Sequence, residues 1–184
     1  MGLGTTKEEY AQLFAETLER EWPILHAWHW IDNHPRRFPN GSVAVSPTYR
    51  IAVRSKVLYE LFKQFKFEDF HWKVPALARY NVDVRRGFLR GLFDAEGCVT
   101  GLDSTRKVRI VLTSKHRSNL DQVPSLLQSF GIDSAVYGYQ RIAQLMILRH
   151  RSILAYANNI GFRLRDKQQK LVDAVALING SSKN

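Results

Sequence analysis

Two carboxylates near the middle of the chain are the first residues whose type and spacing suggest chemistry. Asp94 and Glu96 lie at the end of a stretch, residues 82–96, that has the composition of a helix. The carbonyl groups at a helix C-terminus carry partial negative charge and disfavour acidic side chains there. A hard cation with oxygen ligands, such as Mg²⁺, would offset that repulsion. A solvated pair of acids at a frayed helix end is the alternative.

The helix before these acids has a strip of small residues. Gly87, Gly91 and Ala95 recur every four residues and therefore share one face. Each interior glycine costs a helix roughly 1 kcal/mol relative to alanine, so a compensating contact is expected. Small-residue strips allow two helices to approach closely. Asp94 is predicted beside this strip and Glu96 beyond its end, although packing of the strip on the protein's own sheet is an alternative.

The surrounding sequence predicts the elements that position this helix. Asn81 can cap its start, and Gly97 is predicted to end it. Before it, the sequence predicts a helix after Thr5 or Thr6, an irregular aromatic segment, one or two strands and a helix after Ser55. After it, the sequence predicts strands at residues 98–103, 107–114, 134–140 and 142–149, a helix at 118–130 interrupted near Pro124, and helices that begin at Ser152 and Asp166. The order αββαββαα predicts an α+β fold with an antiparallel sheet.

The charge of the chain points to a polyanion. The net charge is +10, and residues 98–184 hold 13 Lys and Arg against 5 Asp. Such a basic half suits DNA or RNA, whose phosphates bind cations with release of counterions. In the strand from Lys107, the residues Lys107, Arg109, Val111 and Thr113 share the face away from Val108, Ile110 and Leu112, and a β-ribbon of this kind fits the major groove. The other predicted DNA contacts are Arg50, Arg54, Arg106, Lys115, Arg117, Tyr137, Tyr139, Gln140, Arg141, Arg149 and Arg151.

Several classes of protein are disfavoured. No apolar run approaches the roughly 18 residues of a membrane span, and the first residues do not resemble a signal peptide. The single cysteine, Cys98, excludes an internal disulfide framework and disfavours a cysteine-based zinc site. Zinc at His26, His29, Asp32 and His34 is a weak alternative to ordinary packing or DNA contact. A cytoplasmic protein associated with the nucleoid through DNA is the simplest expectation.

The stretch "FLRGLFDAEG", Phe88 to Gly97, resembles the LAGLIDADG motif of homing endonucleases. Leu89, Gly91, Leu92, Asp94, Ala95 and Gly97 match it directly, while Arg90, Phe93 and Glu96 are substitutions that the motif tolerates. The lead-in "KVPALARYNVDVRRG" and the closing "IGFRLRDKQQKL" resemble those of archaeal intron-encoded and intein-type members. The resemblance covers about residues 73–178 and implies the αββαββα homing-endonuclease fold with a saddle-shaped sheet.

The resemblance also implies roles for individual residues. Glu96 would be the metal ligand, with the Ala95 carbonyl beside it, and Asp94 would be mainly at the helix interface. Arg165 or Lys167 would be the basic residue of the catalytic pocket. The metal would be Mg²⁺, with Mn²⁺ or Ca²⁺ able to occupy the same site.

One motif and an active site of two helices together imply a homodimer through Gly87, Gly91, Asp94 and Ala95. Such a dimer would cut both strands of a long, nearly palindromic DNA site and leave short 3′ overhangs. A monomer with a degenerate first half is a variant of this hypothesis. An RNA-splicing maturase and a non-cutting DNA-binding regulator are the alternatives. Residues 1–80 are predicted to be an α/β extension or a decayed partial repeat, residues 81–179 the endonuclease domain, and residues 180–184 a disordered tail.

Overall fold

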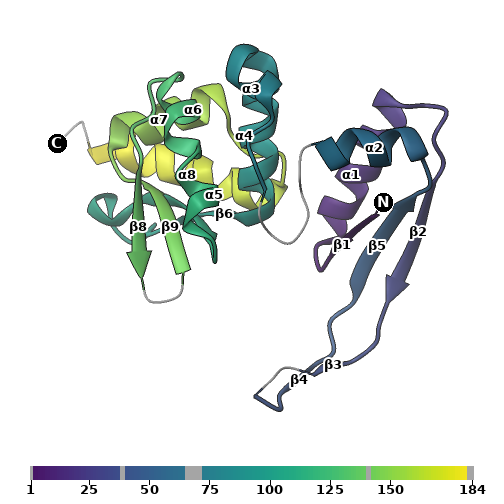
Figure 1. The fold of residues 1–184 in the computed structure, drawn as a ribbon. Helices are drawn as coiled ribbons and strands as arrows, with labels where there is room; N and C mark the ends of the chain where they lie inside the picture. The colour runs from purple at the N-terminus through teal and green to yellow at the C-terminus, as the bar shows by residue number, and fades with distance from the viewer. Residues whose placement is uncertain (1, 38–39, 65–71, 140–141, 182–184) are drawn as a thin grey trace. The chain divides into compact units, whose positions relative to one another are not determined.

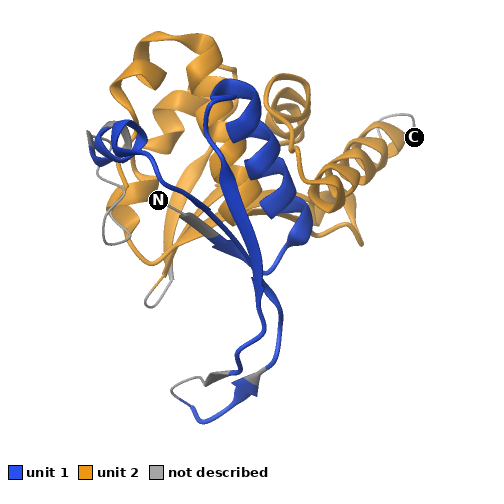
Figure 2. Ribbon diagram, turned by 90° about the vertical axis from the view of Figure 1, so that its right-hand side faces the viewer, with its two compact units in different colours: residues 1–64 blue, residues 65–184 orange. Residues whose placement is uncertain are grey.

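The structure is a computed structural model that describes residues 2–37, 40–64, 72–139 and 142–181 (Figure 1). The chain forms two compact units, residues 1–64 and residues 65–184 (Figure 2). Their boundary lies before the one predicted at residue 80. Val74 and Ala78 explain the difference, since both are buried in the core of the second unit.

The first unit is a three-stranded antiparallel sheet with two helices. Its elements are β1 (Gly2–Thr5), α1 (Glu8–Glu21), β2 (Ala27–Asp32), β5 (Thr48–Val53) and α2 (Lys56–Gln64), with strand order β1-β5-β2. A further short pair, β3 (Arg36–Arg37) and β4 (Val43–Ala44), lies between β2 and β5 in the sequence. The prediction of an irregular aromatic segment is wrong over β2, because its residues pair in register with β5, from Ala27 opposite Val53 to Asp32 opposite Thr48.

The helices cover one face of this sheet (Figure 1). Ala11 and Ala15 of α1 and Leu58 of α2 are buried with Ile51 and Val53 of β5. Since side chains alternate along a strand, Arg50 and Ala52 belong to the opposite face.

The second unit has the predicted order of elements. It consists of α3 (Ala76–Tyr80), α4 (Val82–Glu96), β6 (Gly97–Thr100), η2 (Thr105–Lys107), β7 (Arg109–Ser114), α5 (Arg117–Leu120), α6 (Val123–Gln128), β8 (Ala135–Tyr139), β9 (Ile142–Ile147), α7 (His150–Asn159) and α8 (Arg165–Ser181). The sheet is antiparallel with strand order β6-β7-β9-β8. The predicted α+β class and the αββαββα order are therefore confirmed.

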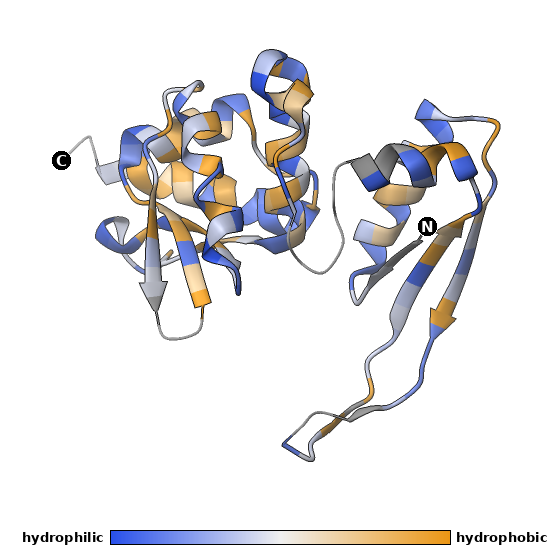
Figure 3. Cartoon of the chain, in the orientation of Figure 1, coloured by the Kyte–Doolittle hydropathy of each residue, from blue (hydrophilic) through white to orange (hydrophobic). Residues whose placement is uncertain are grey.

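The core of this unit lies between the sheet and its helices. Ile110 and Leu112 of β7 are buried with Leu89 and Phe93 of α4. The sequence predicts this face of the strand to point into the core. The ring of Phe93 packs at a tilt on Tyr156 of α7, with 5.1 Å between centroids. Figure 3 shows hydrophobic residues interspersed with hydrophilic ones along these helices. Among the described residues, no helix is long and apolar enough to cross a membrane.

Local predictions differ from the structure at several helix and strand ends. The predicted helix 118–130 forms as α5 and α6, with Pro124 in the first turn of α6, where its missing N–H costs nothing. Lys107 belongs to the 3₁₀ turn η2, not to the strand, and its ammonium group pairs with Asp103 at 2.6 Å. The helix α8 extends through Ser181 into the predicted tail, and residues 182–184 lie outside the described part.

Candidate metal and nucleic-acid site

The motif helix α4 begins and ends at the predicted residues. The Asn81 side chain accepts hydrogen bonds from the N–H groups of Asp83 and Val84, at 2.9 and 3.0 Å. At the other end the chain passes directly from Glu96 into β6 at Gly97. A Cβ atom at Gly97 would lie 2.7 Å from the Phe93 carbonyl oxygen. Because the φ of Gly97 is −86°, this close approach, and not a left-handed conformation, requires the glycine.

The small-residue strip of α4 is uncovered. Gly87, Gly91 and Ala95 are exposed, and a Cβ atom added at either glycine would meet nothing within 4 Å. Packing of the strip on the protein's own sheet therefore does not occur in the part of the chain that the structure describes. The strip is free to contact another helix.

Asp94 differs from its predicted place at the helix interface. Its side chain is buried, and Oδ1 accepts hydrogen bonds from the N–H groups of Arg163 and Leu164, at 3.0 and 3.4 Å. Burial raises the pKa of this carboxyl group, and the two hydrogen bonds partly oppose that rise. Asp94 thus ties α4 to the segment before α8, within its own unit.

Two basic side chains tie the C-terminal part of α4 to the segments around it. The Lys167 ammonium group donates to the carbonyl oxygens of Asp94 and Phe93, at 2.6 and 3.2 Å. Such contacts satisfy terminal carbonyls and complement the helix dipole. One turn earlier, Arg90 donates to the carbonyl oxygen of Ile160 at 2.6 Å. The sequence predicts Lys167 near the site but gives no role to Arg90, since its partner is a backbone atom 70 residues away.

Glu96 is exposed at the end of α4 and borders a pocket of about 450 Å³. The polar residues of this pocket come from the end of β7 and the start of α5. Besides Glu96 they are Thr113, Ser114, Lys115 and His116. His116 is absent from the sequence-predicted set because nothing in the motif points to it. Arg165, the other candidate for a basic catalytic residue, is exposed in the first turn of α8.

The oxygen atoms at and beside Glu96 could supply half of the ligands of a metal site. An exposed carboxylate next to backbone carbonyls offers the oxygen ligands that Mg²⁺ prefers. Within the described ranges, however, no group of three or more Asp, Glu, His or Cys residues is placed to hold a metal ion. The residues therefore fit a metal only if further ligands come from elsewhere.

The open face of the four-stranded sheet carries a polar row. Tyr137 of β8 and Thr113 of β7 each lie opposite Gln144 of β9, so the three residues cross the sheet in one line. Arg109 belongs to the same face of β7 and donates to the Thr100 hydroxyl at 3.2 Å. Tyr137, Thr113 and Arg109 were predicted on this face. Gln144 was missed, because the sequence alone does not fix the register between strands.

The other predicted DNA contacts lie around this sheet. Arg149 and Arg151 both pair with Asp133, at 3.1 and 2.6 Å, and their charges lower the pKa of that carboxyl group, with the Arg151 hydrogen bond as the largest cause. Arg117 lies 3.5 Å from Asp121. Lys115 and Arg106 are exposed, and Tyr139 ends β8. Gln140 and Arg141 lie outside the described residues.

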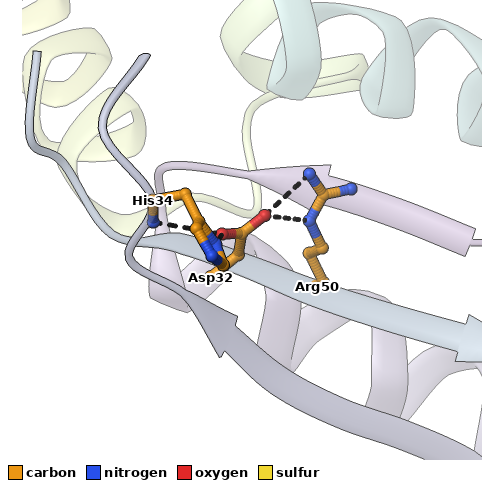
Figure 4. Close-up of polar contacts among 3 residues, drawn as sticks. All are labelled: Asp32, His34 and Arg50. Carbon is orange, nitrogen blue, oxygen red and sulfur yellow. Dashed lines mark hydrogen bonds and ion pairs between the residues drawn. The ribbon is translucent and has the colours of Figure 1, made fainter. Parts of the chain in front are cut away.

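The first unit holds a separate polar cluster, drawn in Figure 4. The Asp32 carboxylate lies 2.6 Å from the Nδ1 atom of His34 and accepts from Arg50 through Nε at 3.0 Å and Nη2 at 2.9 Å. The pKa of Asp32 is lowered to about 2, chiefly by the hydrogen bond with the His34 side chain. The Arg54 guanidinium lies over the ring of Trp28, 5.4 Å from its centroid. The described residues gather no zinc-binding group here.

Comparison with known proteins agrees with this geometry. Residues 83–161 match the family described as LAGLIDADG-like domain. This span begins with α4 and includes the whole four-stranded sheet. Residues 83–161 are thus similar to a LAGLIDADG-like domain, and the second unit has the fold of the LAGLIDADG homing endonucleases.

Solved structures share the fold at low sequence identity. The homing endonuclease I-WcaI bound to its DNA recognition sequence is 13% identical, with a TM-score of 0.67 over 92% of this chain and 74% of that chain. I-DmoI in complex with DNA and Mn is 18% identical, with a TM-score of 0.58 over 87% of this chain and 79% of that chain. The N-terminal LAGLIDADG domain of WhiA is 13% identical, with a TM-score of 0.51 over 89% and 74% of the two chains.

Curated relatives are much longer proteins with unrelated names. The Bacillus subtilis ribonucleoside-diphosphate reductase NrdEB subunit alpha is 25% identical over 161 residues, which are 79% of this chain and 15% of the relative. The probable translation initiation factor IF-2 of Thermococcus kodakarensis is 35% identical over 88 residues, 48% of this chain and 7% of the relative. The chain therefore spans a small part of each, and what it shares with them is a segment.

Proposed function

We propose that this protein is a site-specific DNA endonuclease that hydrolyses phosphodiester bonds with a divalent metal. The observation that carries the proposal is Glu96, which stands exposed at the end of a helix whose small-residue strip is uncovered. A protein that only binds DNA has no need of an acid at this helix end. The basic second half and the polar row on the open sheet face supply the means to hold DNA.

A second copy of the chain is the proposed source of the missing ligands. Two α4 helices packed along Gly87 and Gly91 across a two-fold axis would bring two Glu96 side chains close together. Helix α1 does not offer a similar strip, because its Ala11 and Ala15 are buried in the core of the first unit. We therefore infer a homodimer and a nearly palindromic target that is cut with short 3′ overhangs.

The metal would be held by Glu96 and the Ala95 carbonyl of each copy. Bound Mg²⁺ would stabilise the charge that develops on the phosphate and on the leaving oxygen, and Mn²⁺ or Ca²⁺ could take its place. Asp94 and Lys167 hold the helix end on which Glu96 stands. Lys167, or Arg165 in the first turn of α8, is the proposed basic group that stabilises charge on the phosphate.

The remaining roles follow from this assignment. The first unit, residues 1–64, with Arg50 and Arg54, extends the DNA contacts, and the second unit, residues 65–184, forms the endonuclease domain. The protein would act in the cytoplasm, associated with the nucleoid through its DNA. An RNA-splicing maturase and a non-cutting regulator differ from this proposal in what they bind and in whether the bound strand is cut.

Cleavage of duplex DNA tests the proposal. A DNA duplex selected from a randomised library by binding to the full chain is incubated with the protein in Mg²⁺ or in EDTA. The proposal predicts binding in both conditions and double-strand cutting only with Mg²⁺. Binding without cutting in Mg²⁺ or Mn²⁺ would support the regulator, and preference for a folded intron RNA would support the maturase.

A further inference from the structure

We infer that the open face of the β1-β5-β2 sheet binds an unpaired DNA strand by stacking bases on Trp28 and Trp30. This inference goes beyond the proposed nuclease function, because it involves neither Glu96 nor a metal. It rests on the placement of two indole rings and on the distribution of charge over the first unit.

The two tryptophans are half exposed on the sheet face that the helices leave open. Trp28 lies opposite Ala52 and Trp30 opposite Arg50, and these β5 residues alternate with the buried Ile51 and Val53. The exposed fractions of Trp28 and Trp30 are 46% and 48%. Two large aromatic side chains on one open face are therefore available for contact with a ligand.

Acidic and basic residues are unevenly distributed over the first unit. Helix α1, on the covered side, has five Glu residues and one Arg. Residues 22–55 instead have four Arg residues and a single acid, Asp32. That acid is already bound by Arg50 and His34, as Figure 4 shows, and its lowered pKa keeps it ionised in this cluster. Arg50 and Arg54 lie on the open face with Asp32, so this face has a net positive charge that complements a polyanion, whereas the five Glu residues of α1 repel one.

Indole rings and arginines together favour nucleotides over other anions. The Arg54 guanidinium over Trp28 shows that a planar group can lie on this ring. Trp28 and Trp30 are two residues apart on one strand, as suits two successive bases. In a duplex the faces of the bases are hidden by their neighbours, so stacking on a side chain requires an unpaired strand.

Binding of the full chain to oligothymidylate in EDTA tests the inference. The readout is quenching of tryptophan fluorescence, confirmed by anisotropy of a labelled strand. Loss of one stacking ring by Trp30→Leu is expected to weaken binding about 5- to 150-fold. Trp30→Phe, which keeps a ring, should retain binding within a few-fold and shows that the loss is not due to misfolding. Trp22→Leu, at the end of α1, is the matched control and should bind like the wild type.

Three comparison ligands decide between stacking and charge. An abasic strand of equal length should bind at least 10-fold more weakly than oligothymidylate, and a duplex should not compete at the affinity of the unpaired strand. The inference would be overturned if the protein bound the abasic strand as tightly as oligothymidylate. It would also be overturned if Trp30→Leu bound oligothymidylate with the wild-type affinity. Tighter binding of an RNA strand of matched sequence would overturn the assignment to DNA. All these measurements are made without cutting, so failure of the nuclease proposal leaves them interpretable.

Discussion

The ammonium nitrogen of Lys167 lies 2.6 Å from the carbonyl oxygen of Asp94, where it binds the end of the motif helix. The same nitrogen lies 3.2 Å from the carbonyl oxygen of Phe93. A basic residue that the family resemblance places in the catalytic pocket is therefore also a cap of the helix that presents Glu96. Mutation of Lys167 should therefore affect the stability of the fold as well as the helix end that presents Glu96.

Replacement of Lys167 by methionine should destabilise the fold. Methionine keeps the apolar stem but removes hydrogen bonds from a charged donor, so we expect a loss of about 1.5–3 kcal/mol in the free energy of unfolding. Lys170→Met, at an exposed position of the same helix, should change it by less than about 0.5 kcal/mol. Denaturant unfolding followed by circular dichroism measures both. An unfolding free energy of Lys167→Met equal to that of the wild type would contradict the capping role.

The buried Asp94 carboxyl group should give stability a specific pH dependence. Its pKa is raised above the ordinary 3.8, mainly by burial, so the folded state holds this proton more tightly than the unfolded state. Its contribution is therefore fully present below pH 3.8 and is lost as the pH rises through the folded-state pKa. Asp94→Asn keeps an acceptor oxygen but cannot ionise.

Denaturant unfolding of the wild type and Asp94→Asn between pH 3.5 and 7 measures this effect. The stability of the wild type relative to the variant should fall with rising pH and then become constant. A relative stability that rises with pH would mean that the pKa of Asp94 is lowered, as for an ion-paired carboxylate.

The uncovered strip predicts opposite effects of Gly91→Leu on the monomer and on the dimer. Leucine favours a helix over glycine by somewhat less than about 1 kcal/mol, so the monomer should be at least as stable. At a close helix contact, the added bulk should cost about 1–3 kcal/mol in each copy. Ala176→Leu, at an exposed position of α8, is the control.

Sedimentation at micromolar concentration measures the dimer directly. The wild type and Ala176→Leu should have the mass of two chains, and Gly91→Leu the mass of one. A wild-type mass of one chain with DNA bound would refute the homodimer and favour a monomer in which another element faces α4.

The polar row on the sheet predicts how sequence specificity can be changed. Gln144 lies between Thr113 and Tyr137, so Gln144→Ala should reduce discrimination at one base pair of each half-site by about 1–3 kcal/mol. Lys115→Ala, directly after β7, should instead weaken binding to all sequences. It should also reduce the slope of the logarithm of the binding constant against the logarithm of salt concentration by about 1, which corresponds to one phosphate contact. Binding to a library of single-base variants at two salt concentrations distinguishes the two effects. Uniform weakening by Gln144→Ala would exclude base readout by this residue.

The sequence predicts the parts of this structure that depend on local rules. The ends of α4, the inward face of β7 and the interruption at Pro124 follow from capping, alternation and proline geometry. Predictions fail where distant segments decide the outcome. The strand β2 forms through pairing with β5, and the position of Gln144 depends on strand register.

The candidate site shows the same division. The sequence indicates Glu96 and the strip of Gly87 and Gly91, because motif and spacing are local features. It does not indicate that Asp94 turns inward, since the N–H groups that bind its carboxylate come from Arg163 and Leu164, about 70 residues away. His116 joins Glu96 at one pocket only through the end of β7, so no local pattern could reveal it.

The rate at which Glu96→Gln cuts DNA shows whether Glu96 binds the metal that the proposed nuclease needs. Glutamine keeps the size of the side chain but removes the charge that binds a metal. The control is Glu19→Gln, at an exposed position of α1 in the first unit. With a selected DNA duplex and Mg²⁺, all three proteins should bind the DNA. The wild type and Glu19→Gln should cut both strands. Glu96→Gln should cut at least 100-fold more slowly, as expected when a principal transition-state contact is lost. Cutting by Glu96→Gln at the wild-type rate would remove Glu96 from the metal site and contradict the proposed nuclease mechanism.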